Sequence, residues 1–280
     1  MAVVSTTTLL LMSTSTEERT SLVITQPMLM PWHGLFSQLL LSDRILIYDD
    51  VQLPRGGGAG RGFMTRVQIK TGKGSDWLSI PVKRSGQDNQ RICDALIGPT
   101  DWRRQHLARI EQAYRKAPFF RSIFDEVVSP IYANNTPLLA DFLVGSMEVI
   151  ASVFGIPVPF ERTSQGNWAR EMSKTDRVVE ICRSVGARDY ISGNGGMDYL
   201  DYAPFECEGI RVNYMKYTLK SYPQLHGAFT PYLSLIDLLF CVGTDEAASY
   251  LLTKTVYWKD WPNQINGRPA PLSALNGANN

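Results

Sequence analysis

The segment from Ser21 to Gln52 limits the possible folds more than any other part of the chain. It contains three apolar runs, at Leu22–Thr25, Leu35–Leu41 and Arg44–Tyr48, with Pro27 and Pro31 between the first two. The first and third runs are short and predict strands, whereas the second is longer and predicts a buried helix. A strand, a helix and a second strand in this order are typical of a sheet with helices packed on it.

The rest of the chain also alternates between strand-like and helix-like segments. Phe63–Thr71 and Trp77–Val82 predict a hairpin, several helices follow Asp101, and Ile156–Phe160 predicts a further strand. We therefore predict an α/β fold in which a strand–helix–strand layered domain precedes a more helical C-terminal half. The expected division is a disordered leader (1–20), an N-terminal α/β domain (21–160), a mostly helical C-terminal α/β domain (161–268) and a frayed tail (269–280).

Composition excludes several classes of function. The 280 residues include 28 basic and 27 acidic side chains, so no basic field of the size that nucleic acids require is present. No apolar stretch is long enough for a membrane span. The four cysteines show no C-x-x-C spacing, and we see no secretory signal, so we expect free thiols in a cytoplasmic protein without a structural zinc site.

Two carboxylates, Asp49 and Asp50, directly follow the third run. Strand ends of this kind are where open α/β sheets place their sites. One carboxylate could take a proton from an amine, bind an ammonium group or ligate a divalent metal. Alternatively, one caps a turn and the other is solvated. Because adjacent strand residues point to opposite faces, we expect at most one of them in a site.

Two histidines are candidate bases. His106 lies one helical turn after Trp102, so the two share a face, and imidazole titrates near neutral pH. The alternative is a surface histidine that binds a loop carbonyl. His33 lies in the turn before the predicted helix, where a neutral imidazole is favoured. The alternative there is a turn residue that packs on Trp32.

Three further segments contain candidate binding groups. Arg66 and Lys70 share a face of a predicted strand, where Arg66 could bind a phosphate or carboxylate bidentately, unless both belong to a solvated face. The turn Ser192–Gly196 could hold an anion with its backbone N–H groups, or simply require glycine. The glycine-rich stretch Gly56–Gly62 does not match a phosphate-binding motif, so we expect a flexible lid.

Several short motifs occur in an order that identifies a family. They are Gln26-Pro27, Pro31-Trp32 with Gly34, Asp49–Gln52, Arg66, Trp77-Leu78, Trp102 with His106, Ser192-Gly193 and Tyr222–Gln224. In these motifs the chain resembles the WbqC-like family over roughly residues 21–245. It departs from the family pattern in the Gly56–Gly62 insertion, in Thr65 where an asparagine is common, and in His33 where an aliphatic residue is usual.

The resemblance implies transferase-like chemistry on small intermediates of O-antigen sugar or specialised-metabolite biosynthesis, with amide or other C–N bond formation. Asp49 or Asp50 would orient or deprotonate an amine, and His106 or His33 would move the proton. The expected substrate contacts are Gln26, Trp32, Gln52, Arg66, Ser192 and Asn194. Positioning and general base catalysis are enough for aminolysis of a thioester, so we expect no cofactor and no metal. The acyl partner would be carried on coenzyme A or a carrier protein.

Two alternatives remain open at the level of sequence. The first is a non-catalytic protein that binds a carrier-bound intermediate. The second is a nucleotidyltransferase-like enzyme that uses ATP, because the opening segment has the strand, glycine turn and helix of such folds. Those enzymes use H-x-G-H, whereas Trp32 and Leu35 occupy the two histidine positions around Gly34 in this chain.

Overall fold

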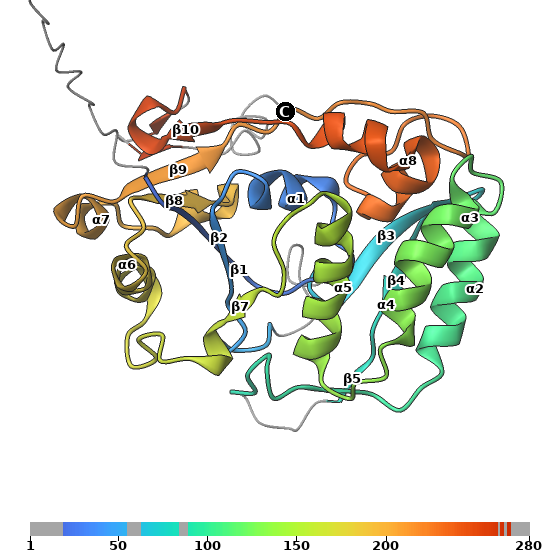
Figure 1. Cartoon of the computed structure of the whole chain (residues 1–280), viewed down its shortest axis with the longest axis horizontal. Coiled ribbons are helices and arrows are strands. Elements are labelled where there is room, and N and C mark those ends of the chain that lie inside the picture. Colours follow the sequence, from blue (N-terminus) through green and yellow to red (C-terminus); the bar gives the residue numbers. More distant parts are fainter. Residues whose placement is uncertain (1–18, 55–62, 84–88, 263, 266–267, 270–280) are drawn as a thin grey trace, which may run out of the picture.

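A six-stranded sheet forms the centre of the protein (Figure 1). The computed structural model describes residues 19–54, 63–83, 89–262, 264–265 and 268–269. The strands are, in spatial order, β10 (Thr255–Tyr257), β9 (Arg211–Met215), β8 (Asp189–Ser192), β1 (Ser21–Thr25), β2 (Arg44–Ile47) and β7 (Glu161–Arg162). All neighbouring pairs are parallel except β10 and β9. The prediction of an α/β fold is confirmed, with a sheet that is mostly parallel.

The order of the strands reverses once, between β1 and β8. From β1 the chain proceeds outward to β2 and β7, and it then returns to the other side of β1 to form β8 and β9. Helix α1 (His33–Leu39) connects β1 to β2, α6 (Lys174–Ser184) leads into β8, and α7 (Ala203–Cys207) connects β8 to β9. In sheets wound in this way, ligands bind beyond the carboxyl ends of the strands at the reversal, which is called the switch point.

Alternating side chains of the central strands enter two separate cores. Val23 and Ile47 join the large cluster beneath α1, whereas Leu22 and Leu46 join a smaller cluster that includes the apolar residues of α6 and α7. The alternation follows from the period of two along a strand. Because helices cover both faces, both sets of side chains are apolar.

The remaining elements extend the layer beneath α1, on the right of Figure 1. They are the hairpin of β3 (Arg66–Thr71) and β4 (Gly74–Ser79), the short pair β5 (Val82–Lys83) and β6 (Leu96–Ile97), and the helices α2 (Trp102–Tyr114), α3 (Phe120–Ile123), α4 (Ser129–Ala133), α5 (Leu139–Val153) and α8 (Leu235–Leu251). The small pair β11 (Gln264–Ile265) and β12 (Arg268–Pro269) follows β10 and lies on the left of Figure 1. None of the helices in the described ranges has the length and apolar character needed to cross a membrane.

The region around residue 160 differs from what the sequence leads us to expect. The strand predicted at Ile156–Phe160 is wrong, because β7 begins only at Glu161; Pro157 and Pro159 lack the N–H groups that a strand in a ladder donates. The central sheet contains strands from both sides of the expected boundary after residue 160, and the division into domains itself stays a prediction. The leader up to residue 18, Gly56–Gly62 and the tail from residue 270 lie outside the described residues.

Candidate functional site

The carboxylates of Asp49 and Asp50 converge on one hydroxyl group. Both residues lie just beyond the end of β2, where the alternation of a strand no longer holds. The Thr163 hydroxyl oxygen lies 2.7 Å from Asp50 Oδ1 and 3.2 Å from Asp49 Oδ1. The expectation that the two side chains point to opposite faces is therefore wrong, and both belong to one buried cluster.

Hydrogen bonds to Asp49 connect the end of β2 to the end of β7. Its carboxylate is fully buried and accepts hydrogen bonds from Arg162 Nε at 2.8 Å, from the Ser164 N–H at 2.8 Å and from the Ser164 hydroxyl at 2.7 Å. Arg162 also pairs with Asp141 on α5, at 2.7 Å. With both oxygens occupied, Asp49 serves to hold these segments together.

Asp50 pairs with two arginines, on α6 and in the loop before it. Arg177 Nη2 lies 2.7 Å and Arg170 Nε 3.3 Å from Asp50 Oδ2. Burial alone would raise the pKa of Asp50, but hydrogen bonds from Arg177 and Thr163 and the two positive charges outweigh it, so the pKa lies below its usual value. The Arg177 guanidinium also lies over the Tyr48 ring, 4.7 Å from its centroid. At neutral pH, Asp50 is a paired carboxylate.

His106 also has partners on both sides of its ring. Nε2 lies 3.1 Å from the Ser79 carbonyl oxygen, and Nδ1 lies 3.0 Å from the Tyr132 hydroxyl. Because a carbonyl oxygen only accepts, Nε2 holds the proton and Nδ1 accepts from Tyr132. Burial lowers the pKa of His106 to about 4, and the Trp102 ring packs against it as the sequence predicts.

The other candidates from the sequence include Arg66, Gln26 and Gln52. The Arg66 guanidinium stacks on the Trp77 ring at 4.3 Å. Gln26 is half-buried directly after β1, and Gln52 is exposed in a bridge with Arg91. In the described part of the chain, no hydrogen bond or ion pair joins Arg66 or His106 to Asp50, and no group of three or more metal-ligating side chains occurs.

His33 occupies the switch point together with a tyrosine that follows β9. It is the first residue of α1 and is buried, and its Nε2 hydrogen-bonds the hydroxyl of Tyr217. Burial lowers the pKa of His33 to about 4, so the imidazole is neutral at physiological pH. Its other nitrogen, Nδ1, is buried with no partner among the described residues. The Trp32 ring packs against both His33 and Tyr217, at 5.6 and 5.0 Å between ring centroids.

The turn after β8 borders the same edge of the sheet. Gln38 on α1 donates from Nε2 to the Ile191 carbonyl at 2.9 Å, which ties α1 to the end of β8. Ser192 and Asn194 follow, and the Ser192 hydroxyl donates to the Gly193 carbonyl at 3.1 Å. Asn194 Oδ1 is buried without a partner in the described structure. An unpaired buried polar atom is rare in folded proteins and calls for an explanation, such as a bound ligand or water.

Several residues of these clusters escape analysis of the sequence. Arg162 and Arg177 lie 113 and 127 residues from the carboxylates they bind, and Tyr217 lies 184 residues from His33. No local spacing connects such residues. Only the position of Tyr217 shortly after a predicted strand, at the edge where sites form, could have indicated it.

Comparison with known proteins places the chain in a family. The model of the WbqC-like protein family matches residues 26–249. An uncharacterised protein of Mycobacterium tuberculosis, Rv1507c, is 34% identical over 235 residues, which cover 81% of this chain and 96% of the relative. No solved structure matches the chain significantly. The chain therefore belongs to the WbqC-like protein family.

Proposed function

We propose that this protein is a biosynthetic enzyme that joins an amine-bearing small molecule to an activated acyl group, and that the reaction takes place at the switch point. One observation carries the proposal. The neutral, buried His33 is hydrogen-bonded to Tyr217 at the edge of the sheet where doubly wound folds bind ligands. The resemblance to the WbqC-like family supplies the class of reaction.

The electrostatics of the pair keep both groups neutral at pH 7, so the imidazole has a free lone pair with which to accept a proton. Burial raises the pKa of Tyr217 and lowers that of His33, so both groups are neutral at pH 7 and the hydroxyl donates to Nε2. The phenol oxygen keeps lone pairs that can accept a proton. Because Tyr217 is half-buried while His33 is buried, the hydroxyl is the member of the pair that a substrate reaches first.

The proposed reaction is aminolysis of a thioester. The amine nitrogen attacks the acyl carbon, and the N–H becomes acidic as the C–N bond forms. Its proton passes to the Tyr217 oxygen while the Tyr217 proton passes to His33 Nε2. The C–S bond then breaks, and the thiolate takes the proton from His33 by the reverse route. The products are an amide and a free thiol, and no oxidant or cofactor enters the balance.

The unpartnered oxygen at this edge suits a substrate that brings hydrogen-bond donors. Asn194 Oδ1 is an acceptor without a donor in the described structure, and an amine or ammonium group supplies N–H donors. Gln26 and Ser192 flank the same edge and are further candidate contacts. We assign Asp49 and Asp50 a positioning role, because their arginine partners already occupy them.

The test is release of free thiol from acyl-coenzyme A compounds in the presence of amino sugars, measured with a thiol reagent. Tyr217→Phe should lower kcat by roughly 10²- to 10⁴-fold, with a smaller change in KM. It should also lower the melting temperature modestly, because His33 Nε2 loses its hydrogen-bond partner, so the assay is run well below that temperature. Tyr232→Phe is the matched control, because Tyr232 packs on the same Trp32 ring but is 58% exposed. Full activity of Tyr217→Phe would refute the proposed relay. Binding of the probes without thiol release would instead favour the non-catalytic alternative.

An ATP-using reaction is the second candidate, and the strand order favours it. Doubly wound sheets with this reversal commonly bind nucleotides at the switch point. However, Leu35, at the second histidine position of the nucleotidyltransferase motif, is buried in the core. Stabilisation of the wild type by ATP that is lost in Tyr217→Phe would support this candidate over aminolysis.

A further inference from the structure

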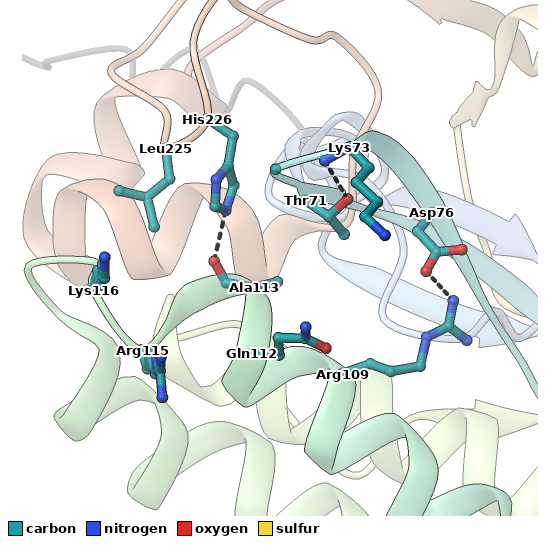
Figure 2. A pocket seen from close by; sticks show the side chains of 11 residues that line it. Thr71, Lys73, Asp76, Arg109, Gln112, Ala113, Arg115, Lys116, Leu225 and His226 are labelled. Atoms are coloured by element: carbon teal, nitrogen blue, oxygen red, sulfur yellow. Dashed lines mark hydrogen bonds and ion pairs between the residues drawn. The ribbon is translucent and has the colours of Figure 1, made fainter.

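A cleft lies between the β3–β4 turn, the C-terminal half of α2 and the loop around His226 (Figure 2). Its volume is about 740 Å³, which is within the range of small-molecule sites. The β-turn contributes Thr71–Lys73, α2 contributes Arg109 and Gln112, and Lys116 lies just after the end of α2. None of these residues belongs to the switch point, so the cleft is a separate feature.

Positive charge dominates the lining of the cleft. Four of the residues that line it are cationic, Lys73, Arg109, Arg115 and Lys116, and only one, Asp76, carries a carboxylate. Arg109 pairs with Asp76 across the cleft, as Figure 2 shows, and this ion pair lowers the pKa of Asp76. The other three cations make no ion pair with any residue that the structure describes. Their charge is therefore available to an anionic ligand.

The loop that forms one wall is held firmly in place. His226 hydrogen-bonds the Ala113 carbonyl through Nε2 at 2.8 Å. The buried ammonium group of Lys70 binds the Gln224 side chain at 3.0 Å and the carbonyl oxygens of Gly227 at 3.1 Å and Ala228 at 2.5 Å. One interpretation of the sequence placed Lys70 on a solvated face of its strand. That interpretation is wrong, because Lys70 is buried. A loop fixed in this way needs little further ordering when a ligand binds in the cleft.

We propose that this cleft binds a phosphorylated small molecule through a diphosphate group. Several unpaired cations around one compact volume suit a ligand with two or more negative charges, which ammonium and guanidinium groups bind strongly. A single carboxylate would leave most of this charge unused. The inference concerns a site beyond the proposed reaction and does not depend on it.

The first experiment is isothermal titration of the full chain with inorganic pyrophosphate. Gln112→Glu places a negative charge in the cleft without a change of shape, and it should weaken binding about five- to tenfold. Gln105→Glu is the matched control, because Gln105 is exposed on the same helix but does not line the cleft. Its affinity should equal that of the wild type. Equal effects of the two variants, or no binding by the wild type at millimolar pyrophosphate, would overturn the proposal.

A second pair of variants separates specific binding from overall charge. The double variant Lys73→Gln/Lys116→Gln should weaken binding at least tenfold, whereas Lys83→Gln/Lys254→Gln removes two exposed cations elsewhere and should not. Equal losses would indicate a general charge effect and overturn the site. Titrations with ADP and coenzyme A identify the source of the diphosphate. If either compound binds more tightly than pyrophosphate, the ligand of the cleft carries an adenosine group. Tyr217→Phe should leave the affinity for pyrophosphate unchanged.

Discussion

The ion pair between Arg177 and Asp50 should contribute strongly to stability. The exposed fractions of the two side chains are 6% and 2%, so removal of one partner leaves a buried charge. Arg177→Met keeps the apolar stem but removes the guanidinium, together with its contact on the Tyr48 ring. Loss of one partner of a buried pair typically costs about 3–5 kcal/mol. Because Arg170 remains 3.3 Å from Asp50, we expect about 3 kcal/mol.

The control for this prediction lies on the same helix. Arg183 pairs with Glu180 at 2.7 Å, but its side chain is 59% exposed, and exposed pairs contribute little. Arg183→Met should lower the free energy of unfolding much less than Arg177→Met does. Urea denaturation of the wild type and both variants at pH 7 provides the comparison. Equal losses in the two variants would refute the reasoning that Arg177 anchors α6 to the end of β2.

The pH dependence adds a second criterion. In the wild type the pKa of Asp50 is lowered by folding, so its stabilisation is present above its ordinary pKa of 3.8 and is lost as pH falls below it. In Arg177→Met, burial with a weaker partner should raise the pKa of Asp50. The deficit of the variant should then shrink as pH falls from 7 towards 4, because protonation removes the buried charge. The double variant Asp50→Asn/Arg177→Met should recover part of the loss at pH 7.

Two further predictions concern glycine and histidine positions. A Cβ on Gly34 would lie 2.2 Å from the Trp32 ring, so Gly34→Ala should displace that ring. Urea denaturation should show a free energy of unfolding lower by roughly 1–3 kcal/mol, and the tryptophan fluorescence spectrum should change. His33 and His106 have folded-state pKa values of about 4, below the ordinary 6.5. As pH falls, both histidines are therefore protonated in the unfolded state before they are protonated in the folded state. Stability should therefore fall from pH 7.5 to 5.5 by about 1 kcal/mol for each histidine, and His106→Gln should remove about half of that slope.

The elements with a regular pattern could be predicted from the sequence. The alternation at Arg44–Tyr48 yields β2, and the turn Gly72–Gly74 between two polar–apolar runs yields the hairpin of β3 and β4. Helices are also expected after Asp101, and α2 begins at Trp102. These features depend on neighbours in sequence. The spatial order of the strands could not be predicted, because parallel pairing between β1 and β8 joins residues about 168 apart.

The site is predictable only in outline, because the state of each polar group depends on distant partners. The strand exits draw attention to Asp49, Asp50 and His33, and the structure shows that all three are buried, while their functional roles stay predictions. The sequence does not reveal that the partners of both carboxylates, such as Arg177, arrive from the β7–α6 segment. Nor does it reveal that Tyr132 and Ser79 occupy both nitrogens of His106.

The polar groups at this edge of the sheet thus separate into two kinds. Asp49 and Asp50 have charged partners, and a change there leaves a buried charge or an unfilled donor, so its main cost falls on stability. His33 Nδ1 and Asn194 Oδ1 lack partners in the described structure, and an unpaired buried atom lowers stability unless something binds it. A ligand bound at the switch point, as proposed, would supply partners to these two atoms, so Asn194→Ala should weaken ligand binding more than it lowers the free energy of unfolding.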